Sequence, residues 1–387
     1  MSRDIAKFLG LNRAARSAVL LLAAALAVAV TGCEPTPPGG GPSPGQKSTT
    51  TATPGAPTHA PSPPTAQASG KPGHVFVINL ENKNYDEAWG ADSAAPYLSK
   101  TLRAQGVLLT QYYGIDHNSH PNYLAQISGQ SSNAMTRLDC PIYAKFRQTG
   151  TSEPGQVDGT GCVYPASVPT LAGQLSSVGK TWKGYMEDMG APCQHPELGA
   201  KDDHHKAKVG DQYATRHNPF VYFEEITSSP DCQNNVVDYS HFADDLKSAD
   251  LTPNLSYITP SLCNDGHDTP CVDGRPGGLE SADSWLQQQV PAILDSPAFK
   301  QDGMLVITFD ETEAKISAPS GVPGGTAGGR VGALVISPFT KGGTTSDTTY
   351  NHYSLLASIE DIFSVPRLGY AGAAGLNSFG PDVLNSG

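Results

Sequence analysis

Short apolar runs alternate with helix-forming stretches along most of the chain. Continuous apolar runs rich in β-branched residues occupy residues 74–80, 304–309 and 331–337, as expected for strands that are buried on both faces. Residues 181–186 and 255–259 predict two more strands. Helices are predicted over residues 96–105, 121–127, 170–178, 281–294 and 352–363. Strands that alternate with helices predict a three-layer α/β sandwich with a mostly parallel central sheet.

Two Gly- and Cys-rich stretches interrupt this alternation, at residues 139–161 and 189–235. Neither has the periodicity of a core element, so both are expected to form loop insertions over one end of the sheet. No internal repeat is present in the sequence.

The first 32 residues have the pattern of a secretory leader. Four basic residues precede an apolar run over residues 18–30, which is too short for a comfortable membrane span. The sequence VTGC at residues 30–33 has the form of a lipobox, which predicts that Cys33 is acylated and becomes the mature N-terminus. The alternative is an ordinary signal peptide that is cleaved nearby, with Cys33 left unmodified.

Residues 34–72 are dominated by Pro, Gly, Ser and Thr and cannot bury a core. A Pro-rich segment extends by roughly 3 Å per residue, so this tether could reach on the order of 100 Å. The predicted organisation is therefore a leader (1–32), a lipidated cysteine with its tether (33–72) and one folded domain (73–387). Such a protein would sit on the extracellular face of a bacterial membrane, with the membrane as a partner through the lipid.

Charge narrows the possible partners of the folded domain. The formal net charge is −12 for the whole chain and becomes more negative when the basic leader is removed. A surface this acidic argues against nucleic-acid binding and against long-range steering of anionic substrates. An anionic ligand would need a local cationic site.

Six cysteines follow Cys33, and an even number in an exported domain predicts disulfides. None lies in a C-x-x-C pair, which argues against a thiolate zinc site. Pairing of nearest neighbours would join residues 140–162, 193–232 and 263–271, one of fifteen possible connectivities.

Oxygen-rich pairs follow two of the predicted buried strands. Glu81 and Asn82 come directly after residues 74–80, and Asp310 and Glu311 come directly after residues 304–309. Ligands of open α/β sheets collect at the carboxyl ends of strands. Acidic groups brought together there repel each other, and a divalent cation with oxygen ligands would resolve the conflict. The alternative is that each acid caps a helix or pairs with an arginine.

Ser119 precedes the helix predicted over residues 121–127, within the sequence DHNSHPNY. A helix N-terminus favours a bound phosphate, and metal coordination would activate the serine hydroxyl as a nucleophile. A serine in this position is also a common helix N-cap, and local sequence alone favours the cap.

Histidines in polar loops are candidates for binding phosphate or protonating a leaving group. They are His195, His204, His205, His217, His267 and His352. His217 and His267 stand out because each lies in a Pro- or Gly-bearing turn, and Asp265 or Asp268 could orient His267.

Six segments occur in the order that is typical of one enzyme family: VFVINLENKNYDEAWG, NSHPNYLAQISGQ, RHNPF, CNDGHD, ITFDETE and NHYSLLASIED. From about residue 74 to about residue 368 the chain resembles the phosphoesterase family of acid phosphatases and phospholipases C, within the alkaline phosphatase superfamily. The resemblance implies an alkaline-phosphatase-like sandwich whose insertions cover the active site.

The resemblance also implies roles for individual residues. One divalent metal would be bound by Glu81, Asn82, Ser119, Asp310 and Glu311, with Ser119 as the nucleophile that forms a phosphoserine intermediate. His120 and Asn122 would line the phosphate site. His217 and His267 would contact phosphoryl oxygens, with His267 as the preferred general acid. His204 is a weaker candidate, and His352 would only cap the last helix.

Two departures bear on these roles. The Gly-rich aromatic stretch of the phospholipases C is replaced by Thr312-Glu313-Ala314-Lys315, which favours small phosphate monoesters as substrates. The acidic pair is Asp-Glu where some members have Asp-Asp, so Glu311 is either a direct ligand or an outer residue. The alternatives are a phosphodiesterase or phospholipase C at the same site, and a non-catalytic surface lipoprotein that binds ligands.

Overall fold

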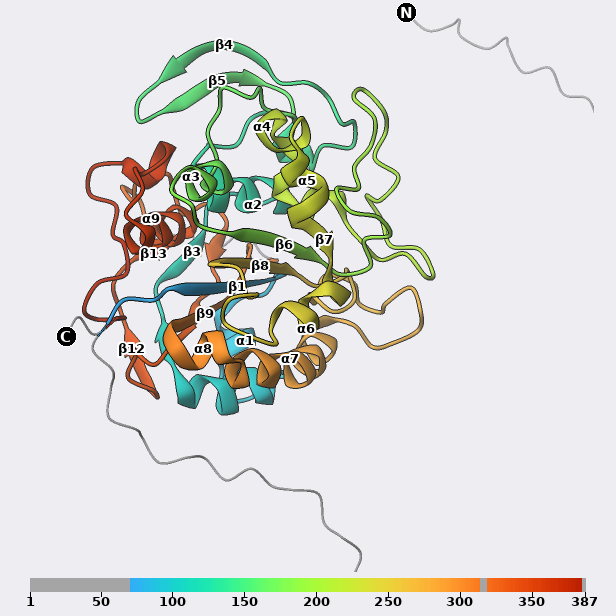
Figure 1. Cartoon of the computed structure of the whole chain (residues 1–387). Coiled ribbons are helices and arrows are strands. Elements are labelled where there is room, and N and C mark those ends of the chain that lie inside the picture. Colours follow the sequence, from blue (N-terminus) through green and yellow to red (C-terminus); the bar gives the residue numbers. More distant parts are fainter. Residues whose placement is uncertain (1–69, 314–318, 385–387) are drawn as a thin grey trace, which may run out of the picture. The chain divides into compact units, whose positions relative to one another are not determined.

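The computed structural model describes residues 70–313 and 319–384, so the predictions made for residues 1–69 lie outside the described part. At the centre is an eight-stranded sheet in the order β12-β2-β11-β9-β1-β8-β6-β7 (Figure 1). Its strands are β1 (His74–Leu80), β2 (Val107–Leu109), β6 (Trp182–Met186), β7 (Val236–Asp238), β8 (Leu255–Thr259), β9 (Gly303–Phe309), β11 (Ala333–Ile336) and β12 (Thr344–Ser346).

The sheet is mostly parallel, as predicted. Strand β11 is antiparallel to its neighbours β2 and β9, and the other neighbouring pairs are parallel. Every residue of β1 and β9 is buried, which explains why both sequences are apolar without alternation. Each fully buried aliphatic or aromatic side chain in these strands contributes about 1.5–3 kcal/mol to folding.

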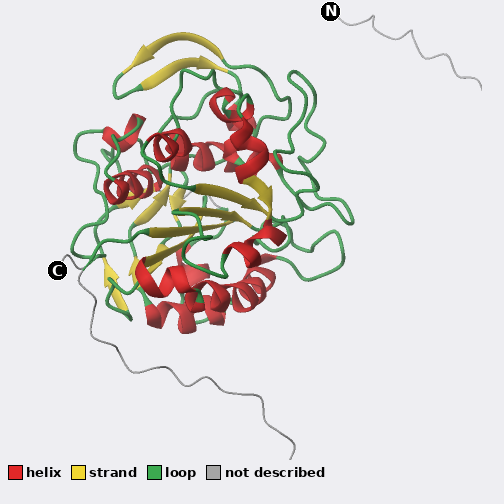
Figure 2. Ribbon diagram, in the orientation of Figure 1, coloured by secondary structure: helices red, strands yellow, loops and turns green. Residues whose placement is uncertain are grey.

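Helices cover both faces of the sheet, which confirms the three-layer sandwich (Figure 2). Helices α2, α3 and α9 lie on one face, and α1, α7 and α8 lie on the other (Figure 1). The α-helices are α1 (Tyr85–Trp89), α2 (Ser119–Ser128), α3 (Leu171–Ser177), α4 (Glu224–Thr227), α5 (Pro230–Asn235), α6 (Phe242–Asp245), α7 (Gly278–Asp295), α8 (Pro297–Asp302) and α9 (His352–Phe363). In the part of the chain that is described, none of them is long and apolar enough to span a membrane.

Shorter helical segments complete the fold. The helix expected over residues 96–105 is a π-helix, η1 (Tyr97–Leu102), followed by the 3₁₀ turn η2 (Arg103–Gln105). The other 3₁₀ segments are η3 (Thr136–Leu138), η4 (Thr215–His217), η5 (Pro219–Tyr222), η6 (Tyr239–His241) and η7 (Gly369–Gly372). The three-residue strands β2, β7 and β12 were not predicted, because such short runs carry no readable periodicity.

The two stretches that were predicted to be loop insertions contain regular secondary structure. Residues 139–161 contain the hairpin of β4 (Arg147–Ser152) and β5 (Gln156–Thr160), and residues 189–235 contain η4, η5, α4 and α5. Every residue of β4 is exposed and most are polar, so the hairpin depends on backbone pairing and gives no apolar signal. A second small sheet joins β3 (Tyr112–Gly114) to β10 (Gly329–Arg330) and β13 (Tyr350–Asn351).

The disulfides join nearest neighbours along the chain: Cys140–Cys162, Cys193–Cys232 and Cys263–Cys271. This confirms the simplest of the possible pairings. Apart from Cys232 in α5, the bonded cysteines lie outside regular helices and strands, so the bonds constrain connecting segments.

Helix α9 carries an acidic side chain in the core. Glu360 is fully buried, and its Oε1 accepts a hydrogen bond from the Leu368 backbone N–H at 2.9 Å. Its Oε2 has no hydrogen-bond partner among the described residues. Burial raises the pKa of Glu360 from 4.5 to about 9, so the carboxyl group is neutral in the folded protein at neutral pH.

We expect Glu360→Gln to make stability less dependent on pH. Between the unfolded pKa near 4.5 and the folded pKa near 9, the folded chain holds a proton that the unfolded chain has lost. Stability therefore falls as pH rises through this window, and a neutral glutamine removes that loss. The difference in melting temperature, variant minus wild type, should grow from about pH 5 to about pH 8 in thermal unfolding monitored by circular dichroism. A difference that stays constant over this range would contradict the prediction.

Candidate active site

The acidic pairs after β1 and β9 meet at one edge of the sheet. Leu80 of β1 pairs with Phe309 of β9, so the residues that follow each strand are also neighbours. The backbone N–H of Asn82 donates to Asp310 Oδ1 at 3.0 Å, and its side-chain amide donates to Glu311 Oε1 at 3.2 Å. Parallel pairing thus brings together two acidic pairs that are more than two hundred residues apart in sequence.

Ser119 points into this cluster from the first turn of α2. Its hydroxyl donates to Glu81 Oε2 at 2.8 Å, and both side chains are buried. The N-cap position is occupied by Asn118, whose side chain makes no capping hydrogen bond. The helix-cap alternative for Ser119 is therefore wrong, because the hydroxyl contacts a carboxylate and does not cap the helix.

A third strand end contributes Asp265. The Glu81 backbone N–H donates to the Asp265 carbonyl at 2.8 Å, which places the segment after β8 beside the end of β1. His217 lies between the two acids, with Nε2 at 3.3 Å from Glu81 Oε1 and Nδ1 at 3.2 Å from Asp265 Oδ2. Neither contact has the geometry of a hydrogen bond. Ligand atoms of these three residues lie within 4.8 Å of one another, a spacing that suits a shared cation.

Tyr123 holds Glu81 and His217 in place. Its hydroxyl donates to Glu81 Oε1 at 2.6 Å, and its ring stacks on the His217 imidazole with 5.1 Å between centroids and 5° between planes. Both carboxylate oxygens of Glu81 therefore accept a hydrogen bond. One comes from Ser119 and the other from Tyr123, which lies one turn further along helix α2.

Electrostatics in the cluster are unfavourable without a cation. Burial raises the pKa of Glu81 and of Asp265 well above the ordinary range, raises that of Asp310 to about 6, and together with Asp310 raises that of Glu311 to about 10. Among the described residues no lysine or arginine forms an ion pair with any of the four. The nearby Lys83 pairs with Glu313. Oxygen ligands with this much buried negative charge fit a divalent metal ion.

His267 lies at the more solvent-accessible side of the cluster, with its side chain 35% exposed. Its Nδ1 lies 2.7 Å from Asp268 Oδ1, and its backbone N–H donates to Asp265 Oδ1 at 2.8 Å. The expected orientation of this ring by a neighbouring acid is therefore present, with Asp268 contacting the ring and Asp265 holding the backbone.

His120 and Asn122, which were expected to line the phosphate site, are both held by contacts within the protein. His120 is fully buried, its ring packs at a tilt of 54° against the ring of Tyr222, and its Nδ1 contacts the Arg216 carbonyl at 3.1 Å. Burial lowers its pKa to about 4, so the ring is neutral. The Asn122 amide makes four hydrogen bonds, all to backbone groups of residues 115–118, and so holds the loop that leads to Ser119.

The other histidines separate into two groups. His352 is buried at the start of α9, where Asn351 supplies the cap, and His352 Nε2 contacts the Asp310 carbonyl at 2.6 Å. The expectation that His352 only caps the helix is therefore wrong: it supports the backbone of an acid in the cluster. His204 and His195 lie in the insertion, where His204 contacts Asp211 and His195 stacks on a tyrosine.

Arg216 was missed by the sequence analysis. It is buried in η4 next to His217, and its guanidinium lies 3.2 Å from His267 Nε2. The only available signal was its place in the segment RHNPF, because a single arginine in a loop carries no periodicity.

The sequence profile of the Phosphoesterase family matches residues 91–366, which includes Ser119, His217, His267 and the acidic pair after β9. The chain belongs to the phosphoesterase family. Glu81 and Asn82 precede the matched segment.

Several proteins of similar sequence are phosphatases by name. The chain is 29% identical to a phosphate-repressible acid phosphatase of Penicillium chrysogenum, over 81% of this chain and 64% of the relative. It is 26% identical to a phosphatidylinositol-3-phosphatase of Mycobacterium tuberculosis, over 77% of this chain and 79% of the relative. The chain spans less than two thirds of the length of the fungal acid phosphatases that it matches.

A solved structure of an alkaline phosphatase superfamily protein from Vibrio parahaemolyticus is also similar. The identity is 13%, the match covers 78% of this chain and 68% of that one, and the TM-score is 0.47.

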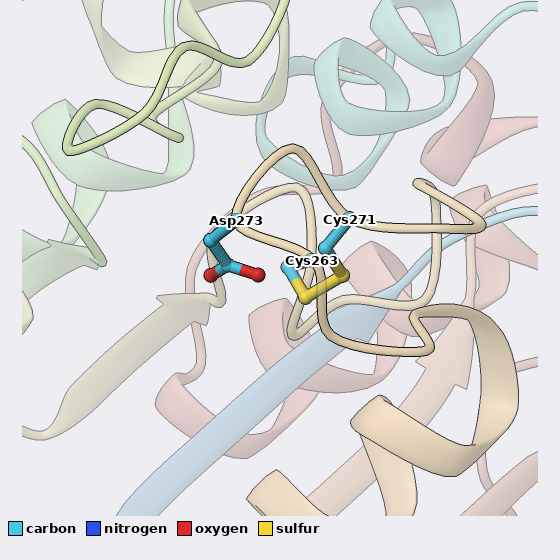
Figure 3. Close-up of side chains that lie close together, drawn as sticks. All are labelled: Cys263, Cys271 and Asp273. Carbon is cyan, nitrogen blue, oxygen red and sulfur yellow. A yellow bond between two sulfur atoms is a disulfide. The ribbon is translucent and has the colours of Figure 1, made fainter.

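The loop that carries His267 is closed by the disulfide Cys263–Cys271 (Figure 3). Asp273 lies beside these two sulfur atoms and, with them, has a spacing that would suit a metal. Because the sulfurs are bonded to each other, they are not thiolate ligands. Asp273 pairs with Arg275, which in turn donates to Asn264 at 2.6 Å, so the group stabilises the loop.

We expect the double variant Cys263→Ser/Cys271→Ser to loosen this loop. Closing a loop of this length stabilises a fold by about 2–3 kcal/mol. The melting temperature should fall, and hydrogen exchange should rise in residues 263–271 while staying low in the buried strand β1. The matched control is Cys193→Ser/Cys232→Ser, which should leave exchange in residues 263–271 unchanged. Equal exchange in the wild type and the 263/271 variant would contradict this role.

Proposed function

We propose that this chain hydrolyses phosphate monoesters, with Ser119 as the nucleophile, at a site that binds one divalent metal ion. The observation that carries the proposal is the Ser119 hydroxyl, which donates to Glu81 inside a buried cluster of carboxylates. Membership of the phosphoesterase family, and relatives named as acid phosphatases and as a phosphatidylinositol-3-phosphatase, support hydrolysis of phosphoric esters.

The metal would be held by Glu81, Asn82, Ser119, Asp310 and Glu311. The carboxyl groups of Glu81, Asp310 and Glu311 are buried together without a lysine or arginine partner among the described residues, which supports that assignment. When bound, the ion supplies positive charge that favours the ionised serine hydroxyl and the transferring phosphoryl group. His352 and Asn82 keep the acids after β9 in position, since one contacts the Asp310 carbonyl and the other donates to both acids.

The reaction proceeds in two displacements. Ser119 reacts as the ionised oxygen, its proton having passed to solvent, and Oγ forms a bond to phosphorus as the ester P–O bond breaks. The leaving alkoxide takes a proton from protonated His267. Water then gives a proton back to His267 as its oxygen attacks the phosphoserine, the P–Oγ bond breaks, and inorganic phosphate leaves with Ser119 again ionised. The accessible position of His267 supports its role as the acid, and His217 is near enough to Glu81 to contact phosphoryl oxygens.

Two of the remaining residues have supporting roles in this proposal. The Asn122 amide is occupied by the backbone of residues 115–118, so we assign it to positioning Ser119. His120 has an Nε2 without a hydrogen-bond partner in the described part of the chain, which keeps it a candidate for the phosphate site.

We also propose that the enzyme is exported and anchored in the membrane through lipidated Cys33. The basic and apolar leader, the VTGC sequence and the Pro-rich tether support this location on the outer face of a bacterial membrane. The acidic net charge supports a small phosphorylated substrate over a nucleic acid.

The closest alternative is a phosphodiesterase or phospholipase C at the same site. The two are separated by comparing p-nitrophenyl phosphate with bis(p-nitrophenyl) phosphate: we expect the monoester to be the better substrate. A non-catalytic surface lipoprotein would hydrolyse neither compound.

Replacing the nucleophile should abolish turnover. We expect Ser119→Ala to lower kcat for p-nitrophenyl phosphate by at least about 10³-fold, since removing a nucleophile has effects of this size or larger. The control Ser284→Ala, on the exposed side of α7, should keep full activity. Full activity of the Ser119 variant would refute the mechanism.

Removing the metal should have the same effect without changing the sequence. Dialysis against a strong chelator is expected to abolish activity and lower the melting temperature, because the buried carboxylates lose their counter-charge. Readdition of single divalent metals should restore both, and metal analysis of the purified protein identifies the resident ion. Activity that survives exhaustive chelation would exclude the metal-dependent mechanism.

A further inference from the structure

Arg216 is a buried cation that has no acidic partner within the described residues. Arg216 is only 4% exposed to solvent. No carboxylate in residues 70–313 or 319–384 lies within ion-pair distance of its guanidinium. Two of its N–H groups are used: one donates to the His205 carbonyl at 2.7 Å, and one to His267 Nε2 at 3.2 Å. A guanidinium has five N–H donors, so its capacity for an anion is largely unused.

A buried charge without a counter-ion is costly, and buried arginines are normally paired. The chain does not lack acids, with 37 Asp and Glu residues in all. Burial raises the pKa of both Glu81 and Asp265, and the charge of Arg216 acts in the opposite direction on each. The guanidinium is therefore close enough to act on the cluster while it remains unpaired.

The surroundings of Arg216 connect it to Ser119. The Arg216 carbonyl contacts Nδ1 of His120, which directly follows Ser119 in the chain. His217, which directly follows Arg216, lies against Glu81. Its guanidinium faces His267, whose ring centroid is 6.0 Å from that of His217. The unpaired cation thus lies among the histidines that surround the nucleophile.

We propose that Arg216 binds the non-bridging oxygens of the phosphoryl group and thereby makes the site selective for monoesters over diesters. This inference rests on the proposed function and adds a residue and a basis for specificity. A monoester dianion presents three terminal oxygens. When one of these oxygens is bound by other groups of the site, two remain to accept from the planar guanidinium fork and from the histidines. In a diester, one of those oxygens carries a second alkoxy group and the charge is only −1.

Binding of the phosphoryl group replaces the present contact between Arg216 and His267. In the structure the guanidinium donates to His267 Nε2, which leaves this nitrogen as an acceptor. When His267 Nε2 takes up a proton from solvent, a phosphoryl oxygen between the two side chains accepts from both Nε2 and the guanidinium, and the Nε2 proton then passes to the leaving group.

The test compares Arg216→Gln and Arg216→Lys with the control Arg147→Gln, which removes an exposed arginine of the β4–β5 hairpin. All are made in the full metal-loaded chain. Steady-state kinetics with p-nitrophenyl phosphate and its bis-ester measure selectivity, and calorimetry with inorganic phosphate measures binding without turnover. Thermal unfolding reports whether each variant is folded.

We expect Arg216→Gln to lower kcat/KM for the monoester by about 10²–10³-fold, as for loss of one group that stabilises transition-state charge. The loss on the diester should be under about tenfold, and the affinity for inorganic phosphate should fall by about tenfold or more. Arg216→Lys keeps the charge but not the planar fork, so its kcat/KM for the monoester should lie between those of the wild type and Arg216→Gln. If Arg216→Gln does not fold, the Lys variant provides the test of selectivity.

Equal losses on both esters, or unchanged affinity for inorganic phosphate, would overturn the role of Arg216 and indicate that it only supports the His205 loop. This failure is distinct from failure of the proposed function, which would appear as a wild-type protein with no activity that depends on Ser119. Calorimetry tests the Arg216 contact in either case.

Discussion

The arrangement of this domain depends on the burial of several carboxylates at one point, where three parallel strands end. Strands β8, β1 and β9 are neighbours, and the segments that follow them bring Asp265, Glu81 and Asp310 together in the interior. Their mutual repulsion and loss of hydration oppose folding, as the raised pKa of each shows. A fold retains such a cluster only when something compensates for the charge, and the oxygen-rich composition favours a metal.

Much of the surrounding structure serves to hold these acids in one geometry. Helix α2 supplies Ser119 and Tyr123, which donate to the two oxygens of Glu81. Beneath them a buried polar network links Gln126 to Asn79 of β1 and to the His352 ring, which contacts the Asp310 carbonyl. Because these side chains hydrogen-bond to one another, a shift of α2 or α9 would break several hydrogen bonds at once.

The opposite side of the cluster is built from connecting segments. His217, Arg216 and His267 come from η4 and from the loop closed by Cys263–Cys271, so their positions depend on 3₁₀ turns, a disulfide and the insertion. Rigid strand ends thus carry the acids, whereas the groups suited to contact a substrate lie on loops, a common division in α/β enzymes.

The sequence by itself determined the fold class, the buried strands and the acids at their ends, whereas the nearest-neighbour disulfides were only one of fifteen possible pairings until the structure was known. Apolar runs, turn residues and spacing are local features that can be read within a few residues of chain. Because parallel strands place their carboxyl ends at one edge of the sheet, the acids that follow these strands could be expected to lie close together. The resemblance of ordered motifs then gave Ser119 a chemical role that local sequence assigned to a helix cap.

Only the tertiary structure decided which groups face that serine. Contacts between segments, or the exact path of a turn, decided four features: the lack of an acidic partner for Arg216 among the described residues, the contact of His352 with Asp310, the place of Asp265 beside Glu81 and the use of the Asn122 amide by a loop. A side chain's partners are set by packing, and an arginine or histidine has the same letter in a solvated loop as in a buried site. The sequence therefore specified where the acidic residues would cluster, and the fold specified which side chains contact them.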